Sequence, residues 1–209
     1  MSLITPESVW NLQKALAAKA KGNPTYRFYS LYDKICRRDV LAFAYACCKE
    51  NGGSPGADGQ TFEQIEAHGR AEWLDGLAEE LKQKKYKPGV VKRVWIPKPD
   101  GKQRPLGIPR IRDRVVEMAT VLILAPIFEQ DFPDEQYGYR PERSAHDAVR
   151  TIHRWLNQGH REVVDADLSG YFDSIPHHEL VKCVARRVCD GAVLKLIQQW
   201  LRVDPSLGT

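Results

Sequence analysis

The sequence predicts an α+β fold, in which helical segments surround one β-hairpin and one further short strand. Three observations support this class. Apolar residues recur at helical spacing over most of the chain, the β-branched and aromatic run at residues 90–96 is followed by a turn and a second run, and an apolar strand pattern returns at residues 162–168. The chain has 209 residues, 43% of them hydrophobic, which is enough to bury a core.

Helices are expected to fill the N-terminal part of the chain. Thr5 and Pro6 have the chemistry of an N-cap and a first helical residue, so they predict a helix over residues 6–21. Residues 28–50 also have apolar positions at helical spacing. They predict two more helices, of which Asp39 caps the second.

A loop, a further helical segment and a hairpin follow. Residues 52–59 are rich in glycine and must form a loop, and Thr61 with Gln64 resembles a capping box that begins a helical segment ending near Lys85. The two hairpin strands are expected at residues 90–96 and 104–108, with turn chemistry between them.

The remaining elements are expected to be mainly helical. Asp113 is expected to begin a long helix that ends at Phe128, and Ser144 is expected to cap another that ends near Leu156. After the strand at residues 162–168, two final helices are expected, at residues 176–188 and 192–203.

Composition excludes several classes of protein. The longest apolar stretch, residues 118–128, is shorter than the roughly 20 residues that span a bilayer, so we expect a buried helix and no membrane partner. The N-terminus has no secretory signal pattern, which favours a cytoplasmic location. The five cysteines form no C-x-x-C pair and are interpreted as small buried apolar residues: Cys36, Cys47, Cys48, Cys183 and Cys189.

Charge is strongly segregated along the chain. Residues 81–114 contain 12 basic and 2 acidic side chains, whereas residues 50–80 contain 1 basic and 8 acidic side chains. A basic segment of this density suits a polyanion such as a nucleic-acid backbone. The alternative is an ordinary solvated basic face, which is the commoner origin of a basic run.

The pattern Asp165-Ala166-Asp167 is the strongest chemical signal. On a strand both aspartates would point to one face, where their repulsion favours a bound cation such as Mg²⁺. The alternative is an N-cap and a turn aspartate in a strand-to-helix connection.

Four stretches stand out in order along the chain: SPGADGQTF (54–62), VWIPKPDGKQRPLGIPRIRDRVV (94–116), YGYRPERSAHDAV (137–149) and DADLSGYFDSI (165–175). In this order they resemble motifs of bacterial group II intron reverse transcriptases, or maturases. The last resembles the palm motif A of that family, and the resemblance extends over roughly residues 50–190.

The resemblance implies a role for individual residues. Asp167 matches the catalytic aspartate that binds Mg²⁺, and the backbone carbonyl of Leu168 would be a further metal ligand. Phe172 matches the aromatic residue that excludes a 2′-hydroxyl and so selects deoxynucleotides. Lys98 and Arg104 match fingers residues that bind the nucleotide triphosphate, and fixed cations flanking a hairpin turn also suit a transferring phosphoryl group. The alternative for this pair is hairpin solubility.

Other arginines are candidates for nucleic-acid contacts. Arg93, Arg110 and Arg112 lie in the basic segment, and Arg140 and Arg143 lie in a loop before a helix. For the latter two, salt bridges to Glu142 or Asp147 are the alternative. Asp165 and Asp173 have no metal role in the resemblance, and we expect them to act on the local field or turn.

The resemblance further implies a right-hand polymerase fold. Its parts would be a helical N-terminal extension at residues 1–60, fingers at 61–160 and a partial palm at 161–209. The family's Y-x-D-D motif and thumb are expected downstream, and the sequence has no Asp-Asp pair. We therefore expect an RNA-directed DNA polymerase piece that is inactive alone, with intron RNA template, DNA primer and dNTP as partners and Mg²⁺ as cofactor.

Two other functions remain open. A non-catalytic module that anchors structured RNA would bind with steep salt dependence and without regard to dNTP or Mg²⁺. A metal site for nucleotide-sugar transfer is a weaker alternative, because no glycine-rich nucleotide-binding loop accompanies the two aspartates.

Overall fold

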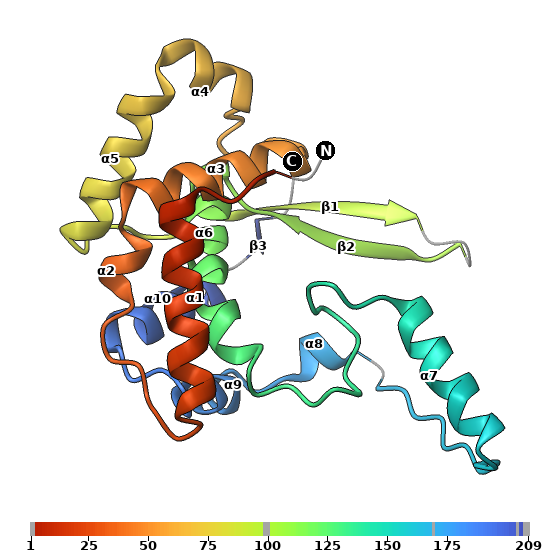
Figure 1. Ribbon diagram of the computed structural model, residues 1–209. Helices are drawn as coiled ribbons and strands as arrows, with labels where there is room; N and C mark the ends of the chain where they lie inside the picture. Colours follow the sequence, from red (N-terminus) through yellow and green to blue (C-terminus); the bar gives the residue numbers. More distant parts are fainter. Residues whose placement is uncertain (1–2, 98–100, 169, 204, 207–209) are drawn as a thin grey trace.

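Helices form most of the molecule, and a long β-hairpin projects from one side of them (Figure 1). The computed structural model describes residues 3–97, 101–168, 170–203 and 205–206. The mixture of helices with a small sheet confirms the α+β class. None of the described helices combines the length and the apolar character that crossing a membrane needs.

Helix α6 (Ile111–Phe128) is the centre of the core. It contains the apolar run that was expected to be buried, and α1 (Glu7–Gly22) and α3 (Arg38–Asn51) pack against it. The apolar side chains along α6, such as Val115 and Ile123, are fully buried. The predicted buried helix is therefore confirmed, although it begins two residues before Asp113.

The N-terminal helices form where the apolar spacing predicted them, but two predicted caps are wrong. The N-cap residues are Pro6 for α1 and Arg37 for α3, and neither makes a side-chain cap hydrogen bond. Asp39 lies inside the first turn of α3 instead, where it pairs with Arg37 at 2.6 Å, and this pairing lowers the pKa of Asp39 to about 2. A short helix, α2 (Tyr32–Ile35), precedes α3.

The capping box at Thr61 is confirmed, with hydrogen bonds to Gln64 in both directions. It begins α4 (Phe62–His68), which Gly69 separates from α5 (Arg70–Lys82). Gly69 has φ +107°, a backbone conformation that glycine adopts without steric cost, so the helical segment bends there. The sequence analysis did not predict this break.

The hairpin also forms as predicted. Strands β1 (Val91–Pro97) and β2 (Gln103–Ile108) are antiparallel, with Ile96 opposite Arg104. The two-residue strand β3 (Pro205–Ser206) pairs in parallel with the start of β1, giving the order β2-β1-β3.

The C-terminal helices return to the N-terminal part of the chain. They are α9 (His177–Ala185) and α10 (Gly191–Leu201), close to the predicted ranges. Between them, the buried guanidinium of Arg187 donates to backbone carbonyls at the end of α1 and in the loop that follows it, including those of Ala20 and Pro24, and pairs with Asp131. Asp190 accepts hydrogen bonds from the backbone N–H groups of Leu31 and Tyr32.

The predicted strand at residues 162–168 is wrong. Helix α7 (Ala145–Asn157), which Ser144 caps as predicted, is followed by an extended segment and then by α8 (Tyr171–Ser174). No backbone hydrogen bond joins residues 161–168 to another described residue, and Val164 is 94% exposed. A strand needs a neighbouring strand to bond its N–H and C=O groups, and the described residues place none there.

The interpretation of the cysteines holds only in part. Cys36 and Cys48 are buried and Cys47 is half-buried, whereas Cys183 and Cys189 are exposed. Cys183 lies near the end of α9, and Cys189 lies in the connection to α10, where its thiol donates to the Arg27 carbonyl at 3.7 Å.

Candidate nucleic-acid interface

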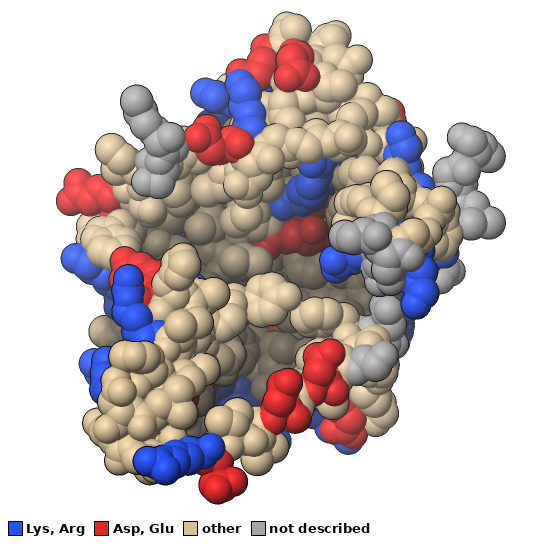
Figure 2. All heavy atoms as spheres, turned by 90° about the vertical axis from the view of Figure 1, so that its right-hand side faces the viewer, with Lys and Arg blue, Asp and Glu red and all other residues tan. Residues whose placement is uncertain are grey.

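The hairpin, the loop at residues 129–144 and the extended segment at residues 160–168 lie on the same side of the molecule (Figure 1). Figure 2 shows this side face-on, hollowed between the hairpin and the lower segments, with basic and acidic atoms in the hollow. We call this the hairpin face. Three of the four sequence stretches that resembled family motifs contribute to it.

The two strands of the hairpin present different side chains on their two faces. Opposite residues of an antiparallel pair share a face, and successive residues alternate between faces. Arg93 therefore shares a face with Trp95, whereas Arg104, which is exposed, shares the other face with Ile96. A single ligand on one side of the hairpin would thus contact one arginine. Lys98 lies outside the described residues.

Exposed aromatic side chains were missed as functional candidates. Trp95 on β1 is half exposed, beside a basic side chain, and such a pairing suits a nucleic-acid base stacked next to its phosphate. The signal was available in the sequence, because Trp95 stands two residues after Arg93 in a predicted strand, which places both side chains on one face.

Asp113 fixes the base of the hairpin. Its side chain is 2% exposed and accepts hydrogen bonds from the Tyr86 hydroxyl at 2.7 Å and the Gly89 N–H at 3.0 Å. Burial, and then the charge of Asp113, raises the pKa of Tyr86. Burial, with a further contribution from Asp113, raises the pKa of Glu117 to about 7. Asp113 is therefore a buried acceptor and not a helix start.

Arg110 is held between the glycine-rich loop and the hairpin. A Cβ on Gly56 would approach the Arg110 backbone to 2.6 Å, and a Cβ on Gly89 would approach the Arg110 guanidinium to 2.5 Å. One turn further along α6, Arg114 also binds the glycine-rich loop, because its guanidinium donates to the carbonyl of Ser54 at 2.9 Å. The loop, α6 and the hairpin thus form one unit.

Arg112 also has a partner within the chain. It pairs with Glu80 at 2.5 Å and lies over the Tyr86 ring. Arg110 lies 4.0 Å from Asp58. Both guanidinium groups thus support the base of the hairpin, and their predicted contact with nucleic acid stays a prediction.

The two arginines in the loop before α7, Arg140 and Arg143, pair with acidic residues of the same loop. The Arg140 side chain is only 6% exposed, pairs with Glu129 at 2.7 Å and donates to the carbonyls of Pro133 and Gln136. Arg143 pairs with Asp134 at 2.9 Å. Ion pairs are thus present, as the alternative reading expected, but with different acids. The burial of Arg140 leaves its guanidinium little surface for a phosphate.

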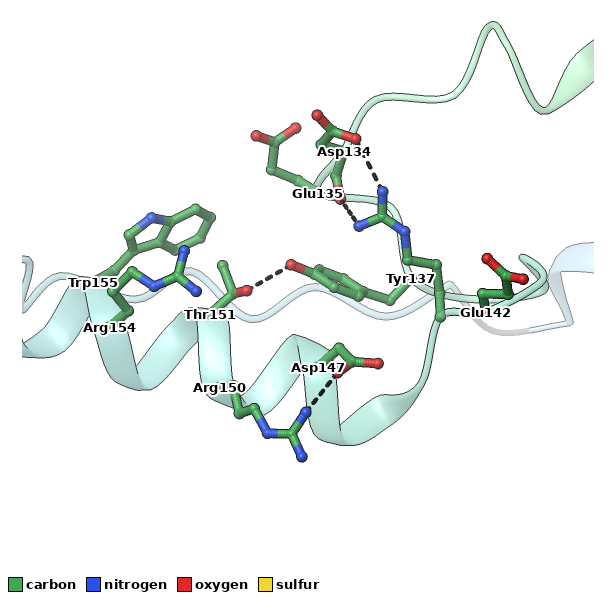
Figure 3. Close-up of a pocket in the computed structure, with 10 residues that line it drawn as sticks. Asp134, Glu135, Tyr137, Glu142, Asp147, Arg150, Thr151, Arg154 and Trp155 are labelled. Atoms are coloured by element: carbon green, nitrogen blue, oxygen red, sulfur yellow. Dashed lines mark hydrogen bonds and ion pairs between the residues drawn. The ribbon is translucent and has the colours of Figure 1, made fainter.

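A cavity of about 650 Å³ lies between the loop at residues 129–144 and α7 (Figure 3). The Tyr137 hydroxyl donates to Thr151 at 2.7 Å across its floor, and Arg150 pairs with Asp147 on the helix. The residues that line the cavity include four acidic and three basic side chains, so the cavity favours neither sign of charge strongly.

An aromatic cluster joins the loop to the DADLSGYF stretch. Phe172 is 71% exposed, and its ring centroid lies 6.3 Å from Tyr139 and 5.5 Å from Tyr171. Tyr139 has φ +59°, a left-handed conformation that is uncommon for a tyrosine. Two stretches that are more than thirty residues apart in sequence therefore meet at exposed aromatic rings.

Asp167 is exposed and has no hydrogen bond or ion pair with any other described residue. The described residues contain no group of three His, Cys, Asp or Glu side chains that suits a metal ion. One carboxylate and the neighbouring Leu168 carbonyl supply too few oxygen ligands for Mg²⁺. The residues present therefore do not form a complete magnesium site, although reverse transcriptases generally use divalent metal ions.

Comparisons with known proteins agree on one family. The family described as "Reverse transcriptase (RNA-dependent DNA polymerase)" matches residues 96–209. Protein YkfC of Escherichia coli K12 is 38% identical over 197 residues, which are 91% of this chain and 51% of that protein. The group II intron-encoded protein LtrA of Lactococcus lactis is 33% identical over 183 residues, 84% of this chain and 29% of its own length.

A more distant relative is nuclear intron maturase 1 of Arabidopsis thaliana, which is 34% identical over 94 residues. The chain spans about half the length of the E. coli relative and less than a third of the L. lactis relative. The similarity therefore concerns part of each relative.

Proposed function

Because this chain belongs to the reverse transcriptase family, we propose that it forms the fingers and first part of the palm of a group II intron RNA-directed DNA polymerase. In this proposal residues 1–60 are the N-terminal extension, 61–160 the fingers and 161–209 the start of the palm of a right-hand fold. An RNA template, a DNA primer and a dNTP occupy the hairpin face, and the protein works in the cytoplasm.

One observation supports this proposal above the others. The contact between Tyr139 and Phe172 brings the loop stretch and the DADLSGYF stretch together on the side to which the hairpin projects. In the proposal Phe172 contacts the sugar of the incoming nucleotide and Arg104, with Lys98, binds its triphosphate. Arg93 and Trp95 contact template on the other face of the hairpin.

Asp167 is the proposed catalytic carboxylate. Its exposure leaves both oxygens available to a metal ion, and Leu168 follows it directly with a backbone carbonyl. Magnesium would supply charge stabilisation at the transferring phosphate. Because the described residues do not complete its site, we assign no reaction step to the metal.

The test uses a full-length polymerase that contains this chain. Asp167→Asn should lower primer extension by roughly a hundredfold or more, while affinity for primed RNA stays unchanged. Asp165→Asn, two residues away, is the matched control and should extend primers normally. Equal activity of the two variants would remove Asp167 from the mechanism.

Sugar selection gives a second measurement on the same protein. Phe172→Val should raise incorporation of ribonucleotides relative to deoxynucleotides, because a smaller side chain leaves space for the 2′-hydroxyl. Unchanged sugar selectivity would contradict the proposed role of Phe172.

The second candidate function is non-catalytic anchoring of structured RNA. It is favoured by the basic segment at residues 81–114, which contains 12 basic and 2 acidic side chains and suits a nucleic-acid backbone. Binding of primed RNA by the 209-residue chain, measured with and without dNTP and Mg²⁺, distinguishes the two functions. A polymerase piece should bind primed RNA more tightly when the matching dNTP and Mg²⁺ are present, whereas an RNA anchor should bind with the same affinity in either case and with steep salt dependence. We expect no primer extension by this chain, and extension would contradict its expected inactivity.

A further inference from the structure

The ring of Phe172 receives little support from its own helix. It lies on α8, a helix of only four residues, and Phe172 is 71% exposed. Among the described residues, the aromatic rings in contact with it are those of Tyr171, its neighbour on α8, and Tyr139, in the loop before α7. Because Tyr171 moves with α8, Tyr139 is the ring that connects Phe172 to a separate element.

The rings of Tyr139 and Phe172 meet edge to face. Their planes are 85° apart and their centroids 6.3 Å apart, an attractive arrangement because the positive edge of one ring faces the negative face of the other. Tyr139 is 96% exposed, and no described residue makes a hydrogen bond with its hydroxyl. The ring of Tyr139, and not its hydroxyl, is therefore the group that acts on Phe172.

The backbone at Tyr139 is a second, independent observation. Tyr139 has φ +59°, a left-handed conformation that costs free energy in any residue with a Cβ. Glycine adopts this conformation without that cost, yet the chain has glycine one position earlier, at Gly138. Such strain persists only where the surrounding structure fixes it, and strained residues are concentrated at functional sites.

Arg140 fixes this backbone conformation. Its buried guanidinium donates to the Glu129 carboxylate from two nitrogens, at 2.9 and 2.7 Å, and to two backbone carbonyls of the same loop from the third. Glu129 is the C-cap of α6, so the residue next to Tyr139 is attached to the end of the central helix. Tyr139 thus has a firm support that Phe172 does not have on α8.

We propose that Tyr139 is a positioning residue that holds the Phe172 ring against the sugar of the incoming nucleotide and so sets how strongly ribonucleotides are rejected. This inference rests on the proposed polymerase function, and it assigns a residue to which the family resemblance gave no role. Rejection of one hydroxyl by a steric contact requires that the excluding group is held within about 0.5 Å, and neighbouring residues must supply that precision.

The experiment measures kcat/KM for a deoxynucleotide and for the matching ribonucleotide, with a full-length polymerase that contains this chain. Tyr139→Ala should lower the ratio of the two values about three- to tenfold, which corresponds to the loss of one edge-to-face ring pair. Tyr139→Phe keeps the ring and should keep the wild-type ratio. The matched control, Tyr29→Ala, removes an exposed tyrosine from the loop before α2 and should leave the ratio unchanged.

This ratio separates positioning from a merely structural role. A variant that is only less stable loses activity with both sugars equally, so its ratio stays at the wild-type value. An unchanged ratio for Tyr139→Ala would overturn the inference, and so would an equal fall for Tyr139→Phe, because that fall would assign the effect to the hydroxyl.

A double variant tests whether Tyr139 acts through Phe172. In a Phe172→Val background, Tyr139→Ala should lower the ratio no further, because the ring that Tyr139 positions is already absent. A further fall as large as in the wild-type background would mean that Tyr139 acts on the nucleotide independently, and it would overturn the positioning role.

The failure of this inference is distinguishable from the failure of the proposed function. If Phe172→Val lowers the ratio and Tyr139→Ala does not, the inference alone fails. If Phe172→Val leaves the ratio unchanged, the proposed role of Phe172 fails and the inference fails with it.

Tyr139→Gly separates the ring from the backbone. Glycine relieves the left-handed conformation, so this variant should unfold at a higher temperature than Tyr139→Ala, while both variants should lower the ratio equally. A wild-type ratio in Tyr139→Gly would overturn the role of the ring.

Discussion

The base of the hairpin and the segment around Asp167 are built in opposite ways. At the hairpin base, Asp113 is buried and both its oxygens accept hydrogen bonds, whereas Asp167 is exposed and without a partner among the described residues. The chain therefore holds its basic hairpin rigidly in its own fold. Asp167, the proposed catalytic carboxylate, lies on the extended segment at residues 161–168, which makes no backbone hydrogen bond to another described residue.

The largest expected effect is the difference in free energy of unfolding between variants of Asp113 and Asp167. Asp113→Asn should lower the free energy of unfolding by about 3 kcal/mol, because the amide replaces one buried acceptor with a donor. Asp167→Asn should change it by less than about 0.5 kcal/mol. Urea denaturation of the 209-residue chain measures both, and similar values would show that the two regions are equally well packed.

The pH dependence should come from the same buried region. Glu117 has its pKa raised to about 7 from the ordinary 4.5, mainly by burial. Between these pH values only the folded state holds the proton, so stability falls as pH rises, by about 2 kcal/mol after allowance for partial exposure. Glu117→Gln should remove this fall, and the difference between wild type and variant from pH 4 to 8 checks it. A difference that does not change with pH would contradict the raised pKa.

A smaller effect tests the contact of Arg110 with the hairpin base. Gly89→Ala should destabilise the chain by about 1–2 kcal/mol and reduce template binding, because the added Cβ meets the Arg110 guanidinium. Gly76→Ala is the matched control: it lies in α5 with open space around it, so alanine should stabilise by about 0.5–1 kcal/mol. If Gly89→Ala behaved like Gly76→Ala, Arg110 would not fix the hairpin.

Local signals in the sequence predicted much of the fold. The capping box at Thr61, the N-cap at Ser144 and the two strands of the hairpin depend on residues that are close in sequence, and all three formed as expected. Part of the predicted turn, at residues 99 and 100, lies outside the described residues. The strand at residues 162–168 depends instead on a distant partner strand, and local pattern does not reveal whether one is present. Alternation of apolar residues was therefore insufficient there.

The same distinction applies to the candidate site. The sequence identified Asp167, Phe172 and the hairpin arginines as candidates, and the hairpin, α8 and the extended segment that contain them lie on one side of the molecule (Figure 1). The sequence did not reveal that Arg140 is buried against Glu129, because that pairing depends on the path of the loop. The exposed ring of Tyr139 was likewise invisible until the loop was placed against Phe172.

Photocrosslinking tests the central claim most directly, that the hairpin and the aromatic cluster contact one nucleic acid. A primer–template with a photoreactive base at the primer terminus is bound to the 209-residue chain, and the crosslinked peptides are identified by mass spectrometry. We expect adducts in both β1–β2 and the segment that contains Phe172. Adducts confined to α10 or to α1 would contradict the account.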